Sequence, residues 1–491
     1  MTSILQYTAL IVLAFNVALL AFDGPLHVHP KNGRYFTDDS GRAILLAGSH
    51  TWATVQDIDH AGRKPFDYPA FLEMCSRNGH NFIRLWHWEQ PVGAGWSRTP
   101  VYFSPLPWAR SKRAKAADGK PKFDLETFDE TYFSRLRDRV EKAGEGGFYV
   151  SVMLFQGWSL KKTGGQGMDP YHFHPFNPEN NIQGIGAPHS TEDSDSCETI
   201  HSLKNPAVVA RQEAYVRKVI DTVNDLDNVL YEIINEGGAV SWQEHFIRFI
   251  HNYEKTKPKQ HPVGFTHRIS PRMWNDDLFA SPADWVSPAK EPQDWMYPGS
   301  VFLQHYEQDP PANDGRKVIL LDTDHLWGHG GTFSWAWKAV CRGHNPIFMD
   351  PWDPIPGDIR KEDLAWFWDE QGRNKNSADY PDWQPLRAAL GDVRRYTRRM
   401  NLAAAVPRQD LVNTLYCLAD CGYGYLVFIP DGGTVTIELR HAQGPFAAEW
   451  FHPLERRTIT VTEPLMGGDY RILDAPFAGE AVLFLEKIGI R

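Results

Sequence analysis

Cysteine is scarce in this chain of 491 residues, which contains five, and their spacing follows no recurring pattern. We therefore expect neither a disulfide framework nor a zinc site of the Cys-x-x-Cys type, although one bridge between Cys417 and Cys421 stays open. A surplus of basic residues is also missing, since 51 Lys and Arg face 61 Asp and Glu. We do not expect nucleic acid as a partner, because binding its phosphates calls for concentrated positive charge.

Several motifs of well-known enzyme classes are absent as well. No Gly-x-Gly-x-x-Gly or Walker loop follows an early strand, and no Gly-x-Ser-x-Gly elbow supports a serine hydrolase. His172 with His174, and Asp322 with His325, offer possible metal ligands. Twenty histidines make such pairs expected by chance, and no His-Glu-x-x-His helix occurs. We expect no metal and no organic cofactor.

Long apolar runs are missing except near the start, where residues 4–22 are apolar and include Ala18-Leu-Leu-Ala21. This pattern is typical of a secretion signal and predicts a signal over residues 1–22 of a secreted or periplasmic protein. No Lys or Arg precedes the run. A short membrane anchor and a mis-assigned start codon therefore remain alternatives, and without a signal the protein would be cytoplasmic. No later stretch could span a bilayer.

What the chain does have is a regular alternation of short apolar runs with amphipathic helical stretches, which is typical of βα units around a parallel sheet. Eight such units predict a (β/α)₈ TIM barrel over residues 23–404, with a hairpin over 32–48 that closes its bottom. The expected strands are Ala43–Ala47, Asn81–Leu85, Phe148–Phe155, Val229–Ile234, Val263–Thr266, Trp285–Ser287, Val318–Leu321 and Pro346–Met349. The expected helices include Tyr68–Arg77, Phe128–Ala143, Pro206–Asp225, Ser241–Lys255, Thr332–Arg342 and Asp382–Asn401.

Two features lie outside this regular pattern. The last helix carries several arginines that we interpret as a solvated face, namely Arg387, Arg394, Arg395, Arg398 and Arg399. From residue 405 the pattern changes to short strands with frequent turns, which predicts a small all-β sandwich over 405–491.

Two apolar runs end in acidic residues at positions where the barrel pattern predicts strand ends. One run ends in Asn235-Glu236, and the other continues into Asp322-Thr-Asp324. The ends of parallel barrel strands meet at one rim, so these carboxylates are expected to lie near one another. Hydrolysis of a glycosidic bond uses a proton donor and a second carboxylate, nucleophile or base. The alternative is that each acid only caps a strand end in a solvated loop.

The positions of these acidic residues resemble those in the clan A glycoside hydrolases. In that clan a Glu after Asn at the end of strand four is the acid/base, and the nucleophile lies at the end of strand seven. Among them, the chain is most similar to the apiosidase-like barrels, which also have an opening hairpin and a C-terminal sandwich, named in that family for collagen binding. Resembling stretches of the sandwich are Tyr425-Leu-Val-Phe-Ile-Pro-Asp-Gly-Gly, Ala448-Glu-Trp-Phe-His-Pro and Ala478-Gly-Glu-Ala-Val-Leu-Phe-Leu.

The resemblance implies roles for particular residues. Glu236 would be the acid/base, Asn235 would hold a sugar 2-hydroxyl, and Arg84 would keep the nucleophile ionised. Strand seven departs from the clan, because it offers two aspartates where a single Glu is expected. We favour Asp324 as the nucleophile, since it lies nearer the rim, with Asp322 as the alternative. Retention follows from the resemblance alone, and the shorter aspartate leaves inversion open.

Polar and indole side chains also follow the other strands, as a sugar pocket requires. The candidate substrate-binding residues are His50, Trp52, Trp88, Trp158, His267, His325, Trp327, Asp350 and Trp352. The sequence thus predicts a retaining glycoside hydrolase acting on a poly- or oligosaccharide. The alternative is a carbohydrate-binding protein without catalytic activity on the same barrel.

Overall fold

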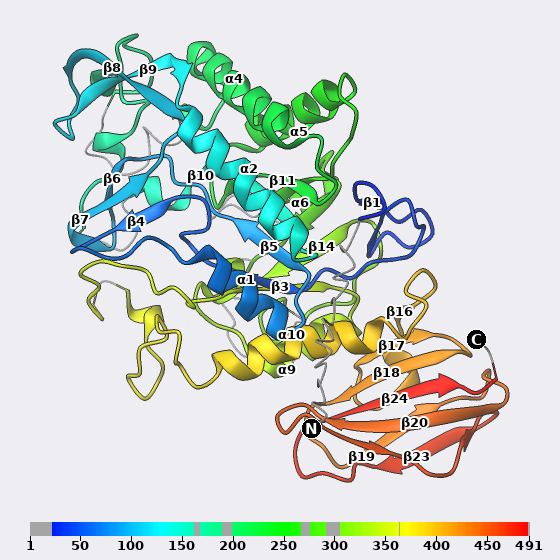
Figure 1. Cartoon of the computed structure of the whole chain (residues 1–491). Helices are drawn as coiled ribbons and strands as arrows, with labels where there is room; N and C mark the ends of the chain where they lie inside the picture. Colours follow the sequence, from blue (N-terminus) through cyan, green and yellow to red (C-terminus); the bar gives the residue numbers. More distant parts are fainter. Residues whose placement is uncertain are drawn as a thin grey trace, which may run out of the picture.

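A computed structural model describes residues 22–161, 167–188, 199–266, 275–290, 305–362 and 364–489. It shows a barrel followed by a smaller β-sandwich, as the sequence predicted (Figure 1). The predicted signal lies outside the described residues, apart from Phe22. Among the helices of the described ranges, none combines the length and the apolar character needed to cross a membrane.

Eight parallel strands close the barrel, and each hydrogen-bonds to its neighbours. Parallel strands covered by helices are buried on both faces, which explains their continuous apolar sequences. In barrel order the strands are β3 (Gly48–His50), β5 (Phe82–Leu85), β10 (Tyr149–Gln156), β11 (Val229–Asn235), β12 (Val263–Thr266), β13 (Trp285–Ser287), β14 (Val318–Asp322) and β15 (Asn345–Met349). The prediction of a (β/α)₈ barrel is confirmed.

The first predicted strand, Ala43–Ala47, is wrong, because β3 begins at Gly48. Ile44 instead forms an antiparallel bridge with Phe36, and the N–H of Leu46 donates to the side chain of Asn345. This segment, with the short strands β1 (His27–Val28) and β2 (Phe36–Thr37), lies at the bottom of the barrel. Its apolar residues pack against the starts of the barrel strands at Phe82, Tyr149, Leu230, Trp285, Val318 and Ile347.

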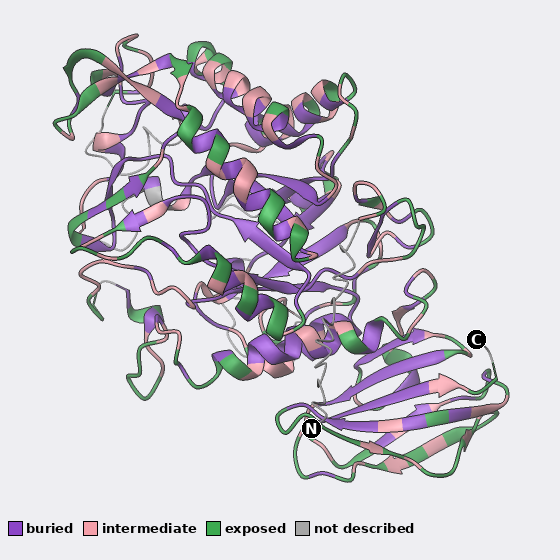
Figure 2. Cartoon of the chain, in the orientation of Figure 1, coloured by how far each residue is buried: buried purple, intermediate pink, exposed green. Residues whose placement is uncertain are grey.

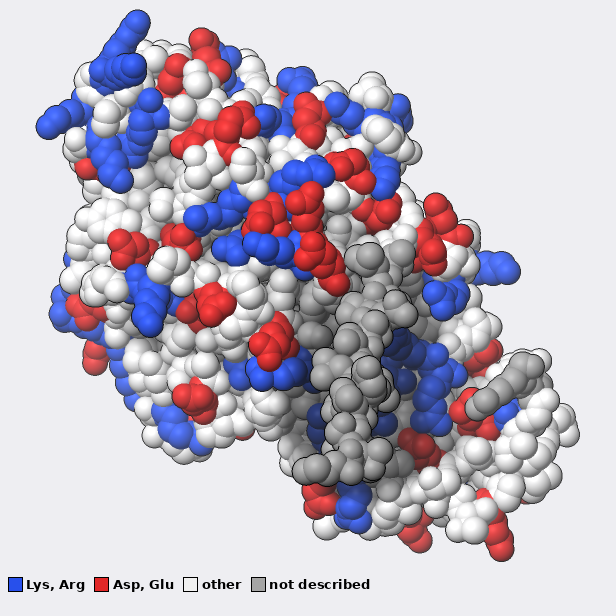
Figure 3. Space-filling view, viewed as in Figure 1, with Lys and Arg blue, Asp and Glu red and all other residues white. Residues whose placement is uncertain are grey.

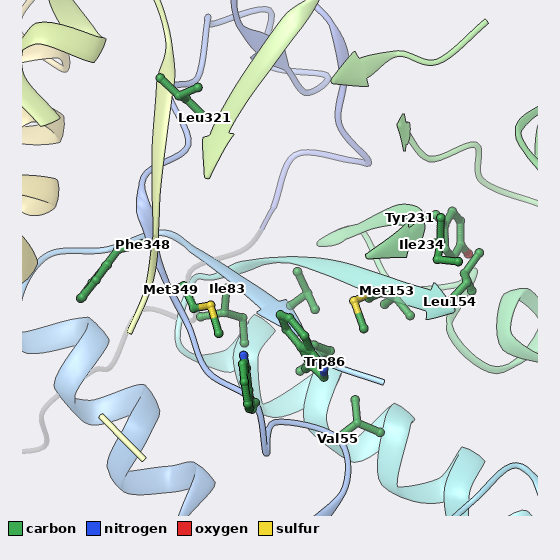
Figure 4. Packing of buried hydrophobic residues seen from close by; sticks show 14 of the residues in the cluster. Val55, Ile83, Trp86, Met153, Leu154, Tyr231, Ile234, Leu321, Phe348 and Met349 are labelled. Carbon is green, nitrogen blue, oxygen red and sulfur yellow. The ribbon is translucent and has the colours of Figure 1, made fainter. Parts of the chain in front are cut away.

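The helices surround the barrel with their apolar faces turned inward, so that their buried residues face the strands and their exposed residues face outward (Figure 2). Figure 4 shows buried side chains that separate strands contribute to this core, among them Ile83, Met153 and Phe348. In the described ranges the α-helices are α1 (Tyr68–Arg77), α2 (Glu130–Glu145), α4 (Pro206–Val223), α5 (Val240–Glu254), α6 (Asn275–Ala280), α8 (Asp324–Trp327), α9 (Phe333–Cys341) and α10 (Trp383–Thr397).

Additional strands that the sequence analysis did not anticipate follow the first two barrel strands. A three-stranded sheet consists of β4 (Asp57–Asp59), β6 (Val92–Ala94) and β7 (Ser97–Ser104), and β8 (Trp108–Lys115) pairs with β9 (Pro121–Phe128). Because Phe128 belongs to β9, α2 begins two residues later than predicted. Lys and Arg side chains gather over β8 and β9, whereas both signs of charge are mixed over most of the visible face (Figure 3).

The C-terminal region forms an antiparallel sandwich with a core of its own. One sheet contains β16 (Val406–Pro407), β17 (Cys417–Asp420), β18 (Gly424–Ile429), β20 (Pro445–His452), β21 (Arg457–Thr460), β22 (Leu465–Met466) and β24 (Ala481–Lys487), and the other pairs β19 (Thr434–Glu438) with β23 (Tyr470–Asp474). The possible Cys417–Cys421 bridge is wrong: both thiols are free, since Cys417 is buried in β17 and Cys421 is exposed after it.

The sandwich packs directly against α9 and α10 of the barrel. The Trp337 ring of α9 lies 6.5 Å from Phe428 and 5.9 Å from Phe451, measured between ring centroids. Tyr396 of α10 lies 5.5 Å from Phe451 and 5.4 Å from Phe484. These residues belong to one continuous apolar cluster with the barrel core.

Candidate active site

Glu236 follows the last residue of β11 and is 7% exposed. Its backbone adopts a φ of +46°, a left-handed conformation that costs a non-glycine residue about 1–3 kcal/mol and persists only when its surroundings hold it. The preceding carbonyl, of Asn235, accepts a hydrogen bond from the N–H of Gly157 at 2.9 Å. A Cβ on Gly157 would lie 2.4 Å from the Cα of Gly237, so only glycine allows this close contact. The barrel thus holds a strained acidic residue at its rim.

Two aspartates lie at the end of β14. Asp322 ends the strand, and its Oδ2 lies 2.9 Å from the Nε2 of His50 on β3. Its Oδ1 accepts the backbone N–H of Asp324 at 3.0 Å. Asp324 begins the short helix α8 and is 9% exposed. The two carboxylates are therefore neighbours, with Asp324 the closer of the two to solvent.

Arg84 on β5 connects these elements across the barrel. Its Nη1 donates to Asp324 Oδ2 at 3.1 Å and its Nη2 donates to Asn235 Oδ1 at 2.7 Å. Its Nε donates to Glu232 Oε2 at 2.7 Å, and its Nη1 lies 3.7 Å from Asp322. Arg84 is only 2% exposed, and its guanidinium thus binds side chains of β11 and of the segment at the end of β14.

Glu232 is a partner of Arg84 that the sequence analysis missed. It lies inside Val229–Asn235, a strand in which every residue is buried. A carboxylate in an apolar strand costs free energy unless it is paired, so its position was a usable signal. Because alternate residues of a strand share a face, Glu232 points into the barrel toward Arg84.

The pKa values of the two aspartates shift in opposite directions. Burial raises the pKa of Asp324 to about 6, with Arg84 opposing this shift and Asp322 reinforcing it. Burial acts in the same direction on Asp322, but the charges of His50 and Arg84 outweigh it and lower its pKa below the usual range. Burial disfavours the charge of Arg84, yet its three carboxylates together raise its pKa. At neutral pH, Asp322 is therefore ionised, whereas the pKa of Asp324 lies not far below neutral pH.

His325 completes the group around Asn235. Its Nε2 lies 3.4 Å from Asn235 Oδ1, and its Nδ1 lies 2.8 Å from the hydroxyl of Ser287 at the end of β13. Ser287 was also missed by the sequence analysis, although it ends a predicted strand. The amide of Asn235 is therefore oriented by Arg84 of β5 and His325 of α8.

The predicted indoles around the site divide into buried and half-buried side chains. Trp52 and Trp88 are 4% and 0% exposed, and Trp88 Nε1 donates to the carbonyl of Trp52 at 2.8 Å. Trp158, Trp327 and Trp352 are half-buried and keep part of their surface open. The half-buried indoles are therefore better placed to stack on a sugar than the two buried ones.

Two candidate residues remain, Asp350 and His267. Asp350 is buried and forms two hydrogen bonds with Arg387 of α10, at 2.8 and 2.6 Å. The interpretation of the α10 arginines as a solvated face is therefore wrong for Arg387, which is buried. His267 lies outside the described residues.

Among the residues that the structure describes, no group of three or more His, Cys, Asp or Glu is arranged to hold a metal ion.

Comparisons with known proteins agree with this architecture. Residues 90–272 match the model of a domain of unknown function (DUF6298). The search of curated proteins returned no match. A solved structure described as "Glycoside hydrolase" is 12% identical with a TM-score of 0.58, and the match covers 96% of this chain and 98% of that one.

A glycoside hydrolase family 5 protein from Bacteroides vulgatus ATCC 8482 is also 12% identical, with a TM-score of 0.58 and coverage of 95% of this chain and 94% of that one. These similarities confirm the predicted fold, a TIM barrel followed by a β-sandwich, which resembles that of these glycoside hydrolases. The finer resemblance to apiosidase-like barrels stays a prediction.

Proposed function

We propose that the protein is a glycoside hydrolase that cleaves O-glycosidic bonds of a poly- or oligosaccharide, with Glu236 as acid/base and Asp324 as nucleophile. One observation carries the proposal: Arg84 binds both Asn235, beside Glu236, and Asp324 across the barrel. A glycosidase needs two carboxylates on opposite sides of the anomeric carbon, and the position of Glu236 and Asp324 at the ends of two barrel strands supports this role. Glycoside hydrolase neighbours of the same fold support the proposal.

Asp324 is favoured over Asp322 because of how their oxygens are used. Both oxygens of Asp322 are engaged, by His50 and by the backbone of Asp324. Within the described part of the chain, the only hydrogen bond found for the Asp324 carboxylate is the one from Arg84 to Oδ2. A nucleophile needs an oxygen that can reach the anomeric carbon, so Asp322 fits the role of a fixed charge that orients its neighbours.

The chemistry then follows in two steps. In the first, Asp324 attacks the anomeric carbon while Glu236 protonates the departing oxygen, and a covalent glycosyl-enzyme forms. In the second, Glu236 takes a proton from a water molecule, which displaces Asp324 with net retention. Asn235, oriented by Arg84 and His325, would bind the sugar 2-hydroxyl as positive charge develops on the ring. Inversion through a water is the alternative if the two carboxylates lie farther apart.

The pKa of Asp324 predicts the acid limb of the pH profile. Below about pH 6 this carboxyl is protonated and cannot act as a nucleophile, so kcat/KM should fall as the pH drops through 6. An ordinary aspartate would place the limb near pH 4. Measurement of kcat/KM from pH 3.5 to 8 checks this, and an acid limb that stays near pH 4 would contradict the raised pKa of Asp324.

Hydrolysis of a panel of plant and bacterial polysaccharides, together with nitrophenyl furanosides and pyranosides, tests the function itself. Sugar release by the wild-type protein that disappears in Glu236→Gln is the expected result. Saturable binding to one glycan without hydrolysis would instead support the alternative, a carbohydrate-binding protein on this barrel. That alternative is motivated by the aspartates in place of a single Glu on strand seven.

We also propose that the protein is secreted or periplasmic, on the basis of the apolar sequence over residues 4–22. Fractionation of expressing cells tests this proposal. A product found in the cytoplasm at its full mass would overturn it.

A further inference from the structure

A further buried carboxylate lies close to the site, on the segment after β5. Glu89 is 6% exposed, and its Oε1 accepts hydrogen bonds from His201 Nε2 at 3.0 Å and from the N–H of Gln156 at 2.7 Å. Its Oε2 lies 3.2 Å from His174 Nε2. The N–H of Phe176 donates to His174 Nδ1 at 2.9 Å, which leaves Nε2 as the protonated nitrogen facing Glu89.

These partners keep Glu89 ionised although it is buried. Burial acts to raise its pKa, but the hydrogen bonds and charges of His201 and His174 outweigh this and lower it far below the usual range. Burial acts to lower the pKa of His174, and the contact with Glu89 opposes this shift. Glu89 is therefore a fixed negative charge that holds two points of the long connection between β10 and α4.

The segments that Glu89 holds contact the chain on both sides of Glu236. The carbonyl of His201 accepts the N–H of Ala239 at 2.9 Å, three residues after Glu236. On the other side, Gly157 donates to the carbonyl of Asn235 at 2.9 Å, and Gly157 directly follows the β10 residue whose N–H Glu89 accepts. The left-handed turn at Glu236 is thus fixed before and after the strained residue.

We propose that Glu89 is a positioning residue that holds Glu236 in this left-handed turn and so directs its carboxyl toward the leaving-group oxygen. The inference rests on the proposed function of Glu236. Loss of the Glu89 charge would loosen both attachments, because an amide nitrogen at this position would face the N–H of an imidazole. The strained turn would then relax, and the acid would no longer reach the oxygen that it protonates.

The dependence of the rate on the leaving group tests this role. A misplaced acid slows the cleavage of a poor leaving group but hardly affects a good one, which departs without protonation. In Glu89→Gln we expect kcat/KM to fall about 100-fold for the methyl glycoside of the sugar identified by the panel, and less than about threefold for its 2,4-dinitrophenyl glycoside. His201→Leu, which keeps the Glu89 side chain but removes one of its two histidine partners, should show the same selectivity with a smaller loss.

Glu254→Gln is the matched control. Glu254 at the end of α5 is also buried and binds a histidine, accepting from His261 Nδ1 at 2.8 Å and from its N–H at 2.7 Å, but these contacts lie away from the Glu236 turn. Glu254→Gln should change kcat/KM by the same factor for both substrates. Equal losses on both substrates in Glu89→Gln and His201→Leu, or no loss, would overturn the positioning role. If Glu236→Gln itself shows no leaving-group selectivity, the proposed function fails instead.

Discussion

Glu236→Gln is expected to lower kcat/KM for glycosides with poor leaving groups by roughly 10³-fold or more, about 4 kcal/mol of transition-state stabilisation. The amide keeps the shape of the side chain but cannot give up a proton. Steady-state kinetics on the substrate found by the panel measure the loss. The free energy of unfolding should change little, because the strain at φ +46° lies in the backbone and is the same in both proteins.

Glu244→Gln provides the control for this substitution, because Glu244 is a half-exposed residue of α5 that pairs with Arg248 on the outer side. It should keep wild-type activity. A Glu236→Gln protein that hydrolyses its substrate at a near-native rate would remove Glu236 from the acid/base role.

Asp324→Asn is expected to have an effect at least as large, roughly 10⁴-fold in kcat, since the nucleophile itself is lost. In Asp324→Ala, added azide should restore turnover of a dinitrophenyl glycoside and yield a glycosyl azide of inverted configuration, because the anion attacks from the face that Asp324 had occupied. Product analysis by NMR identifies the configuration.

Asp322→Asn distinguishes the two aspartates. Without the Asp322 charge, His50 and Arg84 each lose a buried negative partner. We therefore expect a lower free energy of unfolding and a moderate loss of kcat, without azide rescue. Azide rescue in an alanine variant of Asp322, and none in Asp324→Ala, would assign the nucleophile to Asp322.

Much of the barrel could be predicted because buried parallel strands have continuous apolar sequences. Val263–Thr266 and Trp285–Ser287 were located to the residue, and most other strands to within one. The prediction of the first strand failed because Ala43–Ala47 is more apolar than the true strand, Gly48-Ser-His50. Its Ile44 pairs with the bottom segment, and only three-dimensional context distinguishes the two environments.

Residues of the candidate site that follow apolar runs could be predicted, whereas several that are defined by their contacts were missed, among them Ser287. Glu236 and Asp324 follow apolar runs, and so the pattern locates them. Glu232 and the partners of Glu89 are identified by contacts between segments far apart in the chain, such as the 112 residues that separate Glu89 from His201. Likewise, no sequence pattern separates the buried indole of Trp88 from the half-buried one of Trp352, since burial depends on the packing of neighbouring loops.

The contact between the sandwich and α9 and α10 limits how this chain can be divided or recombined. Trp337 and Tyr396 of the barrel share their apolar surroundings with Phe428, Phe451 and Phe484. A barrel ending at residue 404 would expose this aromatic surface to water and would tend to self-associate. Exchange of the sandwich for an unrelated C-terminal module therefore requires a replacement that covers the same rings.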